Sequence, residues 1–376
     1  MKGSIKQILS SLLCILGGVL VGFIVLLLMA MFNENISLAE AFRGIGIILG
    51  GPFTSGRNMM FQLGNMIFNA TPLIFTGLAV AIAFKTGLFN IGAPGQYLMG
   101  AMTSLLVALS IPSSSVHPAI IWILAFMAGA IAGGIWGAIP GFFKAVLNVN
   151  EVIVCIMSNW IAANVVSWVF KDSRFINYAE TKVNFIVKTE INNVATPTLG
   201  MDSLFSGGAV KSYVDIGIFI AIGVAILLFI MMNKTTFGYE LKACGFNKNA
   251  SKYAGMNEKR NIILSMVIAG ALAGAGAALW CLNGHQDFKW DTYQTLPADG
   301  FNGIVVALLA ANNPIGVIFS SLFLKYLNVS GANLAANTSF NEYVSQLIIA
   351  MIVYFSGFAS YITGKLSNRK KNDLNK

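Results

Sequence analysis

The chain has 376 residues, of which 56% are hydrophobic and 10% are charged, and its mean hydropathy is +0.73. Soluble domains carry about 25% charged residues, so this composition excludes a soluble protein and predicts an integral membrane protein. The net charge of +9 does not indicate nucleic-acid binding, because the usual excess of Lys and Arg in the cytoplasmic loops of membrane proteins accounts for it.

Apolar runs long enough to cross a bilayer recur along the chain. A spanning helix needs about 20 such residues, and the runs predict an all-α protein with about ten spans, at residues 8–32, 61–84, 93–111, 119–140, 152–170, 214–232, 262–282, 296–311, 314–331 and 343–363. The first run follows two lysines, as in a secretory signal, but it is too long and has no small-residue cleavage site. We expect it to remain as the first span, followed by an external segment up to residue 60.

The basic residues predict the orientation of this single transmembrane domain, which we assign to residues 1–376 with a core at 61–363. An even number of spans places both termini on one side, and the loops of that side hold most of the Lys and Arg. Since basic loops face the cytoplasm, the termini, the loop 233–261 and the tail 364–376 are predicted to be cytoplasmic. The polar segment 171–213 is then external, and it either covers helix ends or contacts an extracellular solute-binding protein.

The segment Gly87–Gln96 interrupts the apolar pattern between the second and third spans. It holds three glycines, one proline and the amides Asn90 and Gln96, which break a regular helix. Irregular backbone at membrane depth is tolerated only where protein or a water-filled cavity covers it. The segment therefore predicts a broken helix beside a solute pathway.

Glycines recur every four residues in several spans, at Gly18 and Gly22, at Gly129, Gly133, Gly137 and Gly141, and at Gly270 and Gly274. This spacing lets helix backbones approach closely, either inside one bundle or between two subunits. Ten spans divide into two sets of five, which predicts an inverted repeat.

The polar side chains in or beside the spans are mostly neutral. No cluster has metal-ligand spacing and no phosphate-binding loop is present, so we expect no metal and no ATP hydrolysis on this chain. Amides and aromatic rings suit a neutral solute with hydroxyl groups or a ring, although each amide could equally join two helices. The residues expected to line a solute pathway are Phe89, Asn90, Gln96, Asn159, Phe301 and Asn302.

Almost no charge is expected inside the spans, which argues against a proton- or ion-coupled carrier. Lys325 is the exception. Its long side chain is expected either to reach the outer membrane interface or to line a pore.

The loop 233–261 carries the signals of a short helix. Asn247 is placed to cap its N-terminus, residues 248–254 form it, and Gly255 is placed to end it. A short exposed helix between two spans is able to dock in a groove of a partner.

Four segments, in order, resemble motifs of the permease subunits of bacterial ATP-binding-cassette importers for nucleosides and simple sugars. They are Gly-Leu-Phe-Asn-Ile-Gly-Ala-Pro-Gly-Gln at 87–96, Asn-Glu-Val-Ile-Val-Cys-Ile-Met-Ser-Asn-Trp-Ile at 150–161, Gly-Phe-Asn-Lys-Asn-Ala-Ser-Lys-Tyr-Ala-Gly-Met at 245–256, and residues 300–310 with 313–316. Three positions depart from the family: Pro94 replaces a usual Glu, Lys248 a common Pro, and Asn302 a frequent Asp.

This resemblance implies an importer permease of a bacterial plasma membrane, resembling the longer of two permeases in nucleoside systems. It implies a second permease, ATPase subunits that hold ATP and Mg²⁺, and an extracellular binding lipoprotein as partners, besides membrane lipid. It also implies contact with the ATPase through Gly245, Asn247, Ala250, Tyr253 and Gly255. The alternative is an autonomous secondary carrier or channel for a small neutral polar solute.

Overall fold

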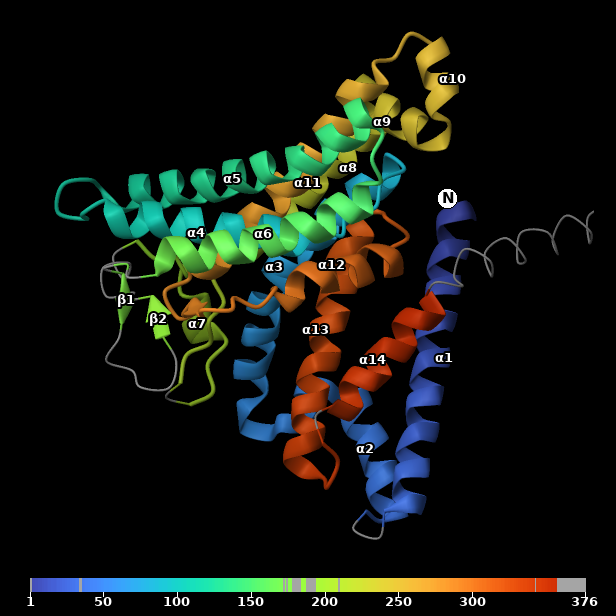
Figure 1. Cartoon of the computed structure of the whole chain (residues 1–376). Coiled ribbons are helices and arrows are strands. Elements are labelled where there is room, and N and C mark those ends of the chain that lie inside the picture. Colours follow the sequence, from blue (N-terminus) through green and yellow to red (C-terminus); the bar gives the residue numbers. More distant parts are fainter. Residues whose placement is uncertain are drawn as a thin grey trace, which may run out of the picture.

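The computed structural model describes residues 2–33, 36–171, 173, 175–177, 184–186, 194–208, 210–341 and 343–356. Within these ranges the chain folds into fourteen α-helices, one 3-10 helix and three short strands (Figure 1). The predicted cytoplasmic tail 364–376, the end of the last predicted span and parts of the loop 171–213 lie outside the described residues.

The helices are α1 (Lys2–Phe32), α2 (Leu38–Gly50), the 3-10 helix η1 (Gly51–Asn58), α3 (Met59–Lys85), α4 (Ala93–Ser110), α5 (Pro118–Leu147), α6 (Glu151–Phe170), α7 (Met201–Leu204), α8 (Gly217–Lys234), α9 (Thr236–Phe246), α10 (Lys248–Tyr253), α11 (Glu258–Cys281), α12 (Ala298–Leu309), α13 (Pro314–Asn337) and α14 (Tyr343–Ser356). Strands β1 (Ile176–Asn177), β2 (Asn184–Ile186) and β3 (Lys289–Trp290) form an antiparallel sheet in that order. This small sheet and α2 were not predicted.

Each predicted span coincides with a helix, so the helical class is confirmed. Six helices among the described residues are long and apolar enough to cross a membrane by themselves, namely α3, α5, α6, α8, α11 and α13. The chain is thus a multi-pass membrane protein. The count of ten spans and the inverted repeat stay predictions.

Helix α3 lies at the centre of the main core. Its residues between Leu73 and Ala83 are at most 3% exposed, and it packs between α11 and α12. A helix that is apolar on all sides lies either in a protein core or in lipid, and α3 lies in the core. Figure 1 shows α1, α2 and α14 beside this bundle, where Leu26, Ile48 and Ile348 share a smaller core with α13.

Helices α5 and α11 cross through their glycines. A Cβ at Gly270 would lie 2.1 Å from the carbonyl oxygen of Gly133, and one at Gly274 would lie 2.3 Å from that of Gly129. The two backbones are therefore in direct contact, and Figure 1 shows the helices running side by side. The glycine spacing thus serves packing within the chain here, which is the first of the two predicted alternatives.

An acidic side chain is buried at the start of α8, within the predicted span 214–232. Asp215 is 2% exposed, and its carboxylate accepts hydrogen bonds from the side chain of Asn283 and the backbone N–H of Gly217. These two hydrogen bonds satisfy a carboxylate that burial alone would destabilise.

Candidate solute pathway and coupling loop

The broken helix predicted at Gly87–Gln96 is confirmed. Helix α3 ends at Lys85, Gly87 has a φ of +75°, and α4 begins at Ala93 with proline in its first turn. The positive φ favours glycine at this position, and the missing N–H of Pro94 costs nothing in the first turn of a helix. The local sequence is thus sufficient to end one helix and start the next.

Buried amides hold the irregular backbone of this break. The side chains of Asn90 and Gln96 donate to each other over 2.9 and 3.1 Å, and Asn90 Oδ1 also accepts from the backbone N–H of Gly92 at 3.1 Å. Asn159, on α6, accepts from the N–H of Gly95 and donates to the carbonyl of Ile91, both over 2.9 Å. The network satisfies backbone groups that helical hydrogen bonds leave free.

These amides are closely packed. Asn90, Gln96 and Asn159 are at most 2% exposed, and none of them lines the cavities described below. Phe89 is partly buried against Phe84, with ring centroids 5.3 Å apart.

The second predicted polar segment, at Phe301 and Asn302, lies on α12 against the same region. A Cβ at Gly300 would lie 2.5 Å from the Cα of Pro94, and Thr76 Oγ1 donates to the carbonyl of Asp299 over 2.9 Å. The structure therefore brings α12 and the break together, although about 200 residues separate them in sequence.

A cavity of about 700 Å³ opens between α12, α13 and α14. Its polar lining comes from Asp299 and Asn302 on α12, Lys325 and Asn328 on α13, and Gln346 on α14. The remaining lining residues are apolar, among them Val305, Leu324 and Ile349. Of the six residues expected to line a pathway, Asn302 is the one that reaches this cavity, and Phe301 beside it is 38% exposed.

An ion pair crosses the wall of this cavity. Lys325 Nζ donates to Asp299 Oδ1 over 2.7 Å, and the two side chains are 12% and 22% exposed. Lys325 thus lines a cavity and is paired with Asp299, and its two predicted roles, at the outer interface or in a pore, stay predictions. The pair corrects one expectation, because charge is buried within the predicted spans. Asp299, Asn328 and Gln346 were missed. An isolated Lys in one span and an isolated Asp in the preceding one were the signal that could have found the pair.

The short helix in the loop 233–261 forms as predicted. Asn247 Oδ1 caps α10 by accepting from the N–H of Ala250 over 3.0 Å, and Gly255 follows the helix with a φ of +81°. Ser251 attaches α10 to α9, since this side chain is 3% exposed and contacts Cys244 of α9. The opposite face presents Tyr253, which is 93% exposed.

The base of this loop touches the break. A Cβ at Gly245 would lie 2.3 Å from the carbonyl oxygen of Lys85, and one at Gly87 would lie 3.1 Å from the Cα of Gly245. Only glycine allows this approach, so the loop and the break are in backbone contact. Phe246, the next residue, is 92% exposed, and it was not among the residues predicted for this loop.

Comparison with known proteins places these features in a family. A family model described as "Branched-chain amino acid transport system / permease component" matches residues 62–356. The Guanosine ABC transporter permease protein NupP of Bacillus subtilis (strain 168) is 36% identical over 318 residues, covering 83% of this chain and 86% of that protein.

Two further relatives match over most of their length. The Nucleoside ABC transporter permease protein NupB of Lactococcus lactis subsp. cremoris is 34% identical and covers 94% of this chain and 92% of that protein. The Glucose ABC transporter permease protein TsgB13 of Haloferax volcanii is 28% identical and covers 86% and 84%. This chain belongs to the branched-chain amino acid transport system permease family, as a non-catalytic transmembrane subunit of an ATP-binding-cassette importer.

Proposed function

We propose that this permease imports nucleosides, and that simple sugars such as ribose or galactose are the next candidates. The observation that carries the proposal is the cavity of about 700 Å³ with three amide side chains in its wall. Small-molecule sites measure about 300–1,000 Å³, and amides pair with both the hydroxyl groups of a sugar and the edges of a base. The relatives named for guanosine, nucleoside and glucose systems support the same classes.

In this proposal Asn302, Asn328 and Gln346 contact the solute, and Phe301 borders its path. The other four predicted residues do not contact the solute and act by stabilising the broken helix. They are Phe89, Asn90, Gln96 and Asn159. They keep its backbone in one shape, so that α12, which packs on Pro94, has a fixed support. The pathway would open alternately to the two sides of a bacterial plasma membrane.

The test is uptake by the complete complex with radiolabelled guanosine, uridine, ribose and galactose. We expect Asn302→Leu to slow nucleoside uptake by about fivefold, the effect of one neutral hydrogen bond of about 1 kcal/mol. Asn164→Leu is the matched control, because Asn164 is exposed on α6 and donates only to its own helix. Equal uptake by both variants would place the solute elsewhere, and uptake without an ATPase would favour an autonomous carrier.

We propose that α9 and α10 couple the permease to an ATPase that holds ATP and Mg²⁺. Large exposed aromatic side chains are typical anchors of protein interfaces, and Phe246 and Tyr253 supply two at the tip of the loop. A displacement of α9, on which Gly245 lies, would reach the break directly through the contact between Gly245 and Gly87. An extracellular binding lipoprotein and a second permease complete the proposed assembly.

Tyr253→Ala and Ala250→Asp should uncouple the ATPase while the permease stays in the membrane. The first removes an anchor of the interface, and the second places a charge in a face that partner contact would desolvate. Gly255→Val should act in the same direction, because a β-branched residue is strained at a φ of +81°. ATPase stimulation by loaded binding protein is the measurement, with exposed Lys234→Gln as the control. Normal stimulation in all three variants would make the loop a plain connector.

We also propose that the termini and α10 face the cytoplasm, from the excess of basic residues on that side. On a background without the four native cysteines, Lys248→Cys should react with an impermeant thiol reagent only after cells are opened. Ser203→Cys, on exposed α7, should react in intact cells. The reverse pattern would invert the topology.

A further inference from the structure

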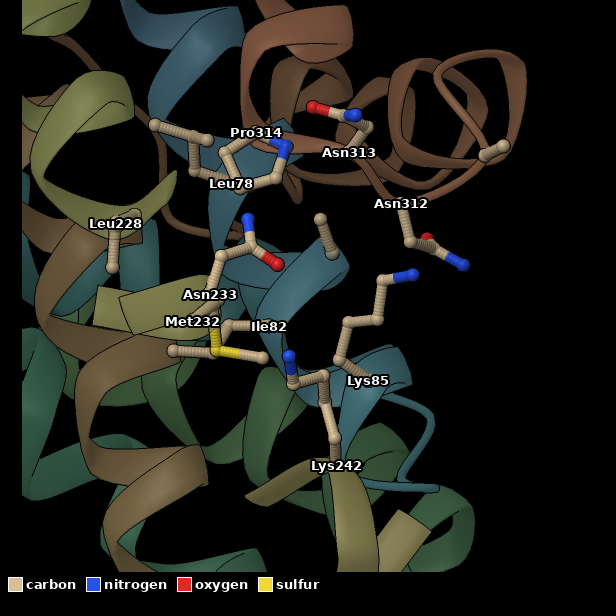
Figure 2. Close-up of a pocket in the computed structure, with 12 residues that line it drawn as sticks. Leu78, Ile82, Lys85, Leu228, Met232, Asn233, Lys242, Asn312, Asn313 and Pro314 are labelled. Carbon is tan, nitrogen blue, oxygen red and sulfur yellow. The ribbon is translucent and has the colours of Figure 1, made fainter. Parts of the chain in front are cut away.

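A second cavity, of about 110 Å³, lies at the other end of α3 from the external loops. Apolar side chains of α3 and α8 form its floor, and its rim comes from the ends of these two helices, from α9 and from the turn between α12 and α13 (Figure 2). The rim residues are Lys85, Asn233, Lys242, Asn312 and Asn313.

This cavity is positively charged. Lys85 and Lys242 both line it, and none of its lining residues is acidic. In the part of the chain that the structure describes, neither lysine lies within ion-pair distance of a carboxylate. Figure 2 shows the Lys85 side chain extending toward Asn312 and the Lys242 side chain extending toward Ile82 on the floor. Two ammonium groups in one cavity repel each other, and a bound anion would relieve this repulsion.

The turn adds a hydrogen-bond acceptor that has no donor. Ala311 and Asn312 have φ values of +50° and +57°, and Asn312 Oδ1 is buried without a hydrogen-bond partner. Asn313 already caps α13 by accepting from the N–H groups of Ile315 and Gly316. A ligand that satisfies this site therefore combines negative charge with a hydroxyl donor.

We propose that the cavity binds a phosphate group that carries a neighbouring hydroxyl, as in the phosphoglycerol headgroup of an anionic lipid. The volume of about 110 Å³ exceeds the roughly 30 Å³ share of one water molecule several-fold, so it admits a phosphate but is far smaller than the solute cavity. Basic pockets between membrane helices on the cytoplasmic side bind anionic headgroups. The two lysines would hold the phosphate oxygens, and Asn312 Oδ1 would accept from the hydroxyl. The site is independent of the proposed solute.

Native mass spectrometry of the detergent-purified complex, titrated with single lipids, tests the site. Two lysines near an anionic headgroup predict a preference of about 30-fold for phosphatidylglycerol over phosphatidylcholine. We expect the double variant Lys85→Gln with Lys242→Gln to lose most of this preference. The double variant Lys85→Arg with Lys242→Arg keeps both positive charges and should keep the preference. The double variant Lys234→Gln with Lys252→Gln, which removes two exposed lysines outside the cavity, is the matched control and should leave the preference unchanged.

Phosphatidylmethanol tests the hydroxyl, because it has the phosphate but no glycerol. Wild-type protein should bind it several-fold more weakly than phosphatidylglycerol, by about one neutral hydrogen bond, and Asn312→Leu should bind the two alike. Displacement of the lipid by millimolar inorganic phosphate would support phosphate recognition but identify free phosphate as its source. Equal losses in the cavity variant and the control, or no preference in wild-type protein, would overturn the proposal. A preference that is present in the isolated permease and lost in the complex would assign the cavity to a partner protein and overturn it as well.

Discussion

Gly270→Val is expected to prevent folding of the permease. The added Cβ would lie 2.1 Å from the carbonyl oxygen of Gly133 and 3.0 Å from the Cα of Gly137, so the backbones of α5 and α11 would have to separate. Overpacking of flexible side chains costs about 1–3 kcal/mol, and the cost here should be higher because the obstacle is backbone. Size-exclusion chromatography in mild detergent should show aggregate or no protein.

Gly223→Val provides the matched control, since the same change is made inside α8 at a position with nothing within 4 Å of the added Cβ. Because valine has a slightly higher helix propensity than glycine, this variant should be as stable as the parent or slightly more stable. If Gly270→Val gave monodisperse protein with a melting temperature like that of Gly223→Val, the contact between α5 and α11 would not be needed for folding.

Lys325→Met is expected to have the second-largest effect on stability. The substitution leaves the Asp299 carboxylate, which is 22% exposed, without its partner at 2.7 Å. Removing one member of a largely buried pair costs about 3–5 kcal/mol, whereas neutralising both is often tolerated. The double variant Asp299→Asn with Lys325→Met should therefore recover most of the melting temperature lost by the single variant.

Lys211→Met is the control for this experiment. Lys211 forms a pair of similar length with Asp202, 3.0 Å, but its side chain is 65% exposed, and exposed pairs contribute about 0–1 kcal/mol. An Lys325→Met variant as stable as Lys211→Met would show that the carboxylate of Asp299 is adequately solvated without the lysine. Retained uptake by the double variant would further show that the pair supports the fold and not the solute.

The helix break illustrates how far the sequence alone reaches. Three glycines and a proline between two apolar runs predict the interruption, and the structure has it between Lys85 and Ala93. The same reading left open whether Asn90, Gln96 and Asn159 line a solute pathway or join helices, and the structure pairs them with each other and with the backbone. The sequence shows that an amide is present, but its partner depends on which helix lies opposite.

The charged residues show the same limit. Lys325 stood out as a single charge in an apolar helix, but its partner is 26 residues away on another helix. The distance between two helices in space is not encoded in their individual apolar patterns. For this reason the cavity between α12, α13 and α14, with Asn328 and Gln346 in its wall, could not be predicted.

The sequence by itself determined what depends on neighbouring residues: the membrane class from apolar runs, the break at Gly87, and the short helix between the cap at Asn247 and the stop at Gly255. These follow from local hydrophobicity, backbone freedom and capping. Only the tertiary structure decided that the glycines of α5 face those of α11, that Asp299 meets Lys325, and where the two cavities lie. Lipid is as apolar as the helix surfaces, so hydrophobicity does not select partners within a membrane, and close packing and buried polar contacts do.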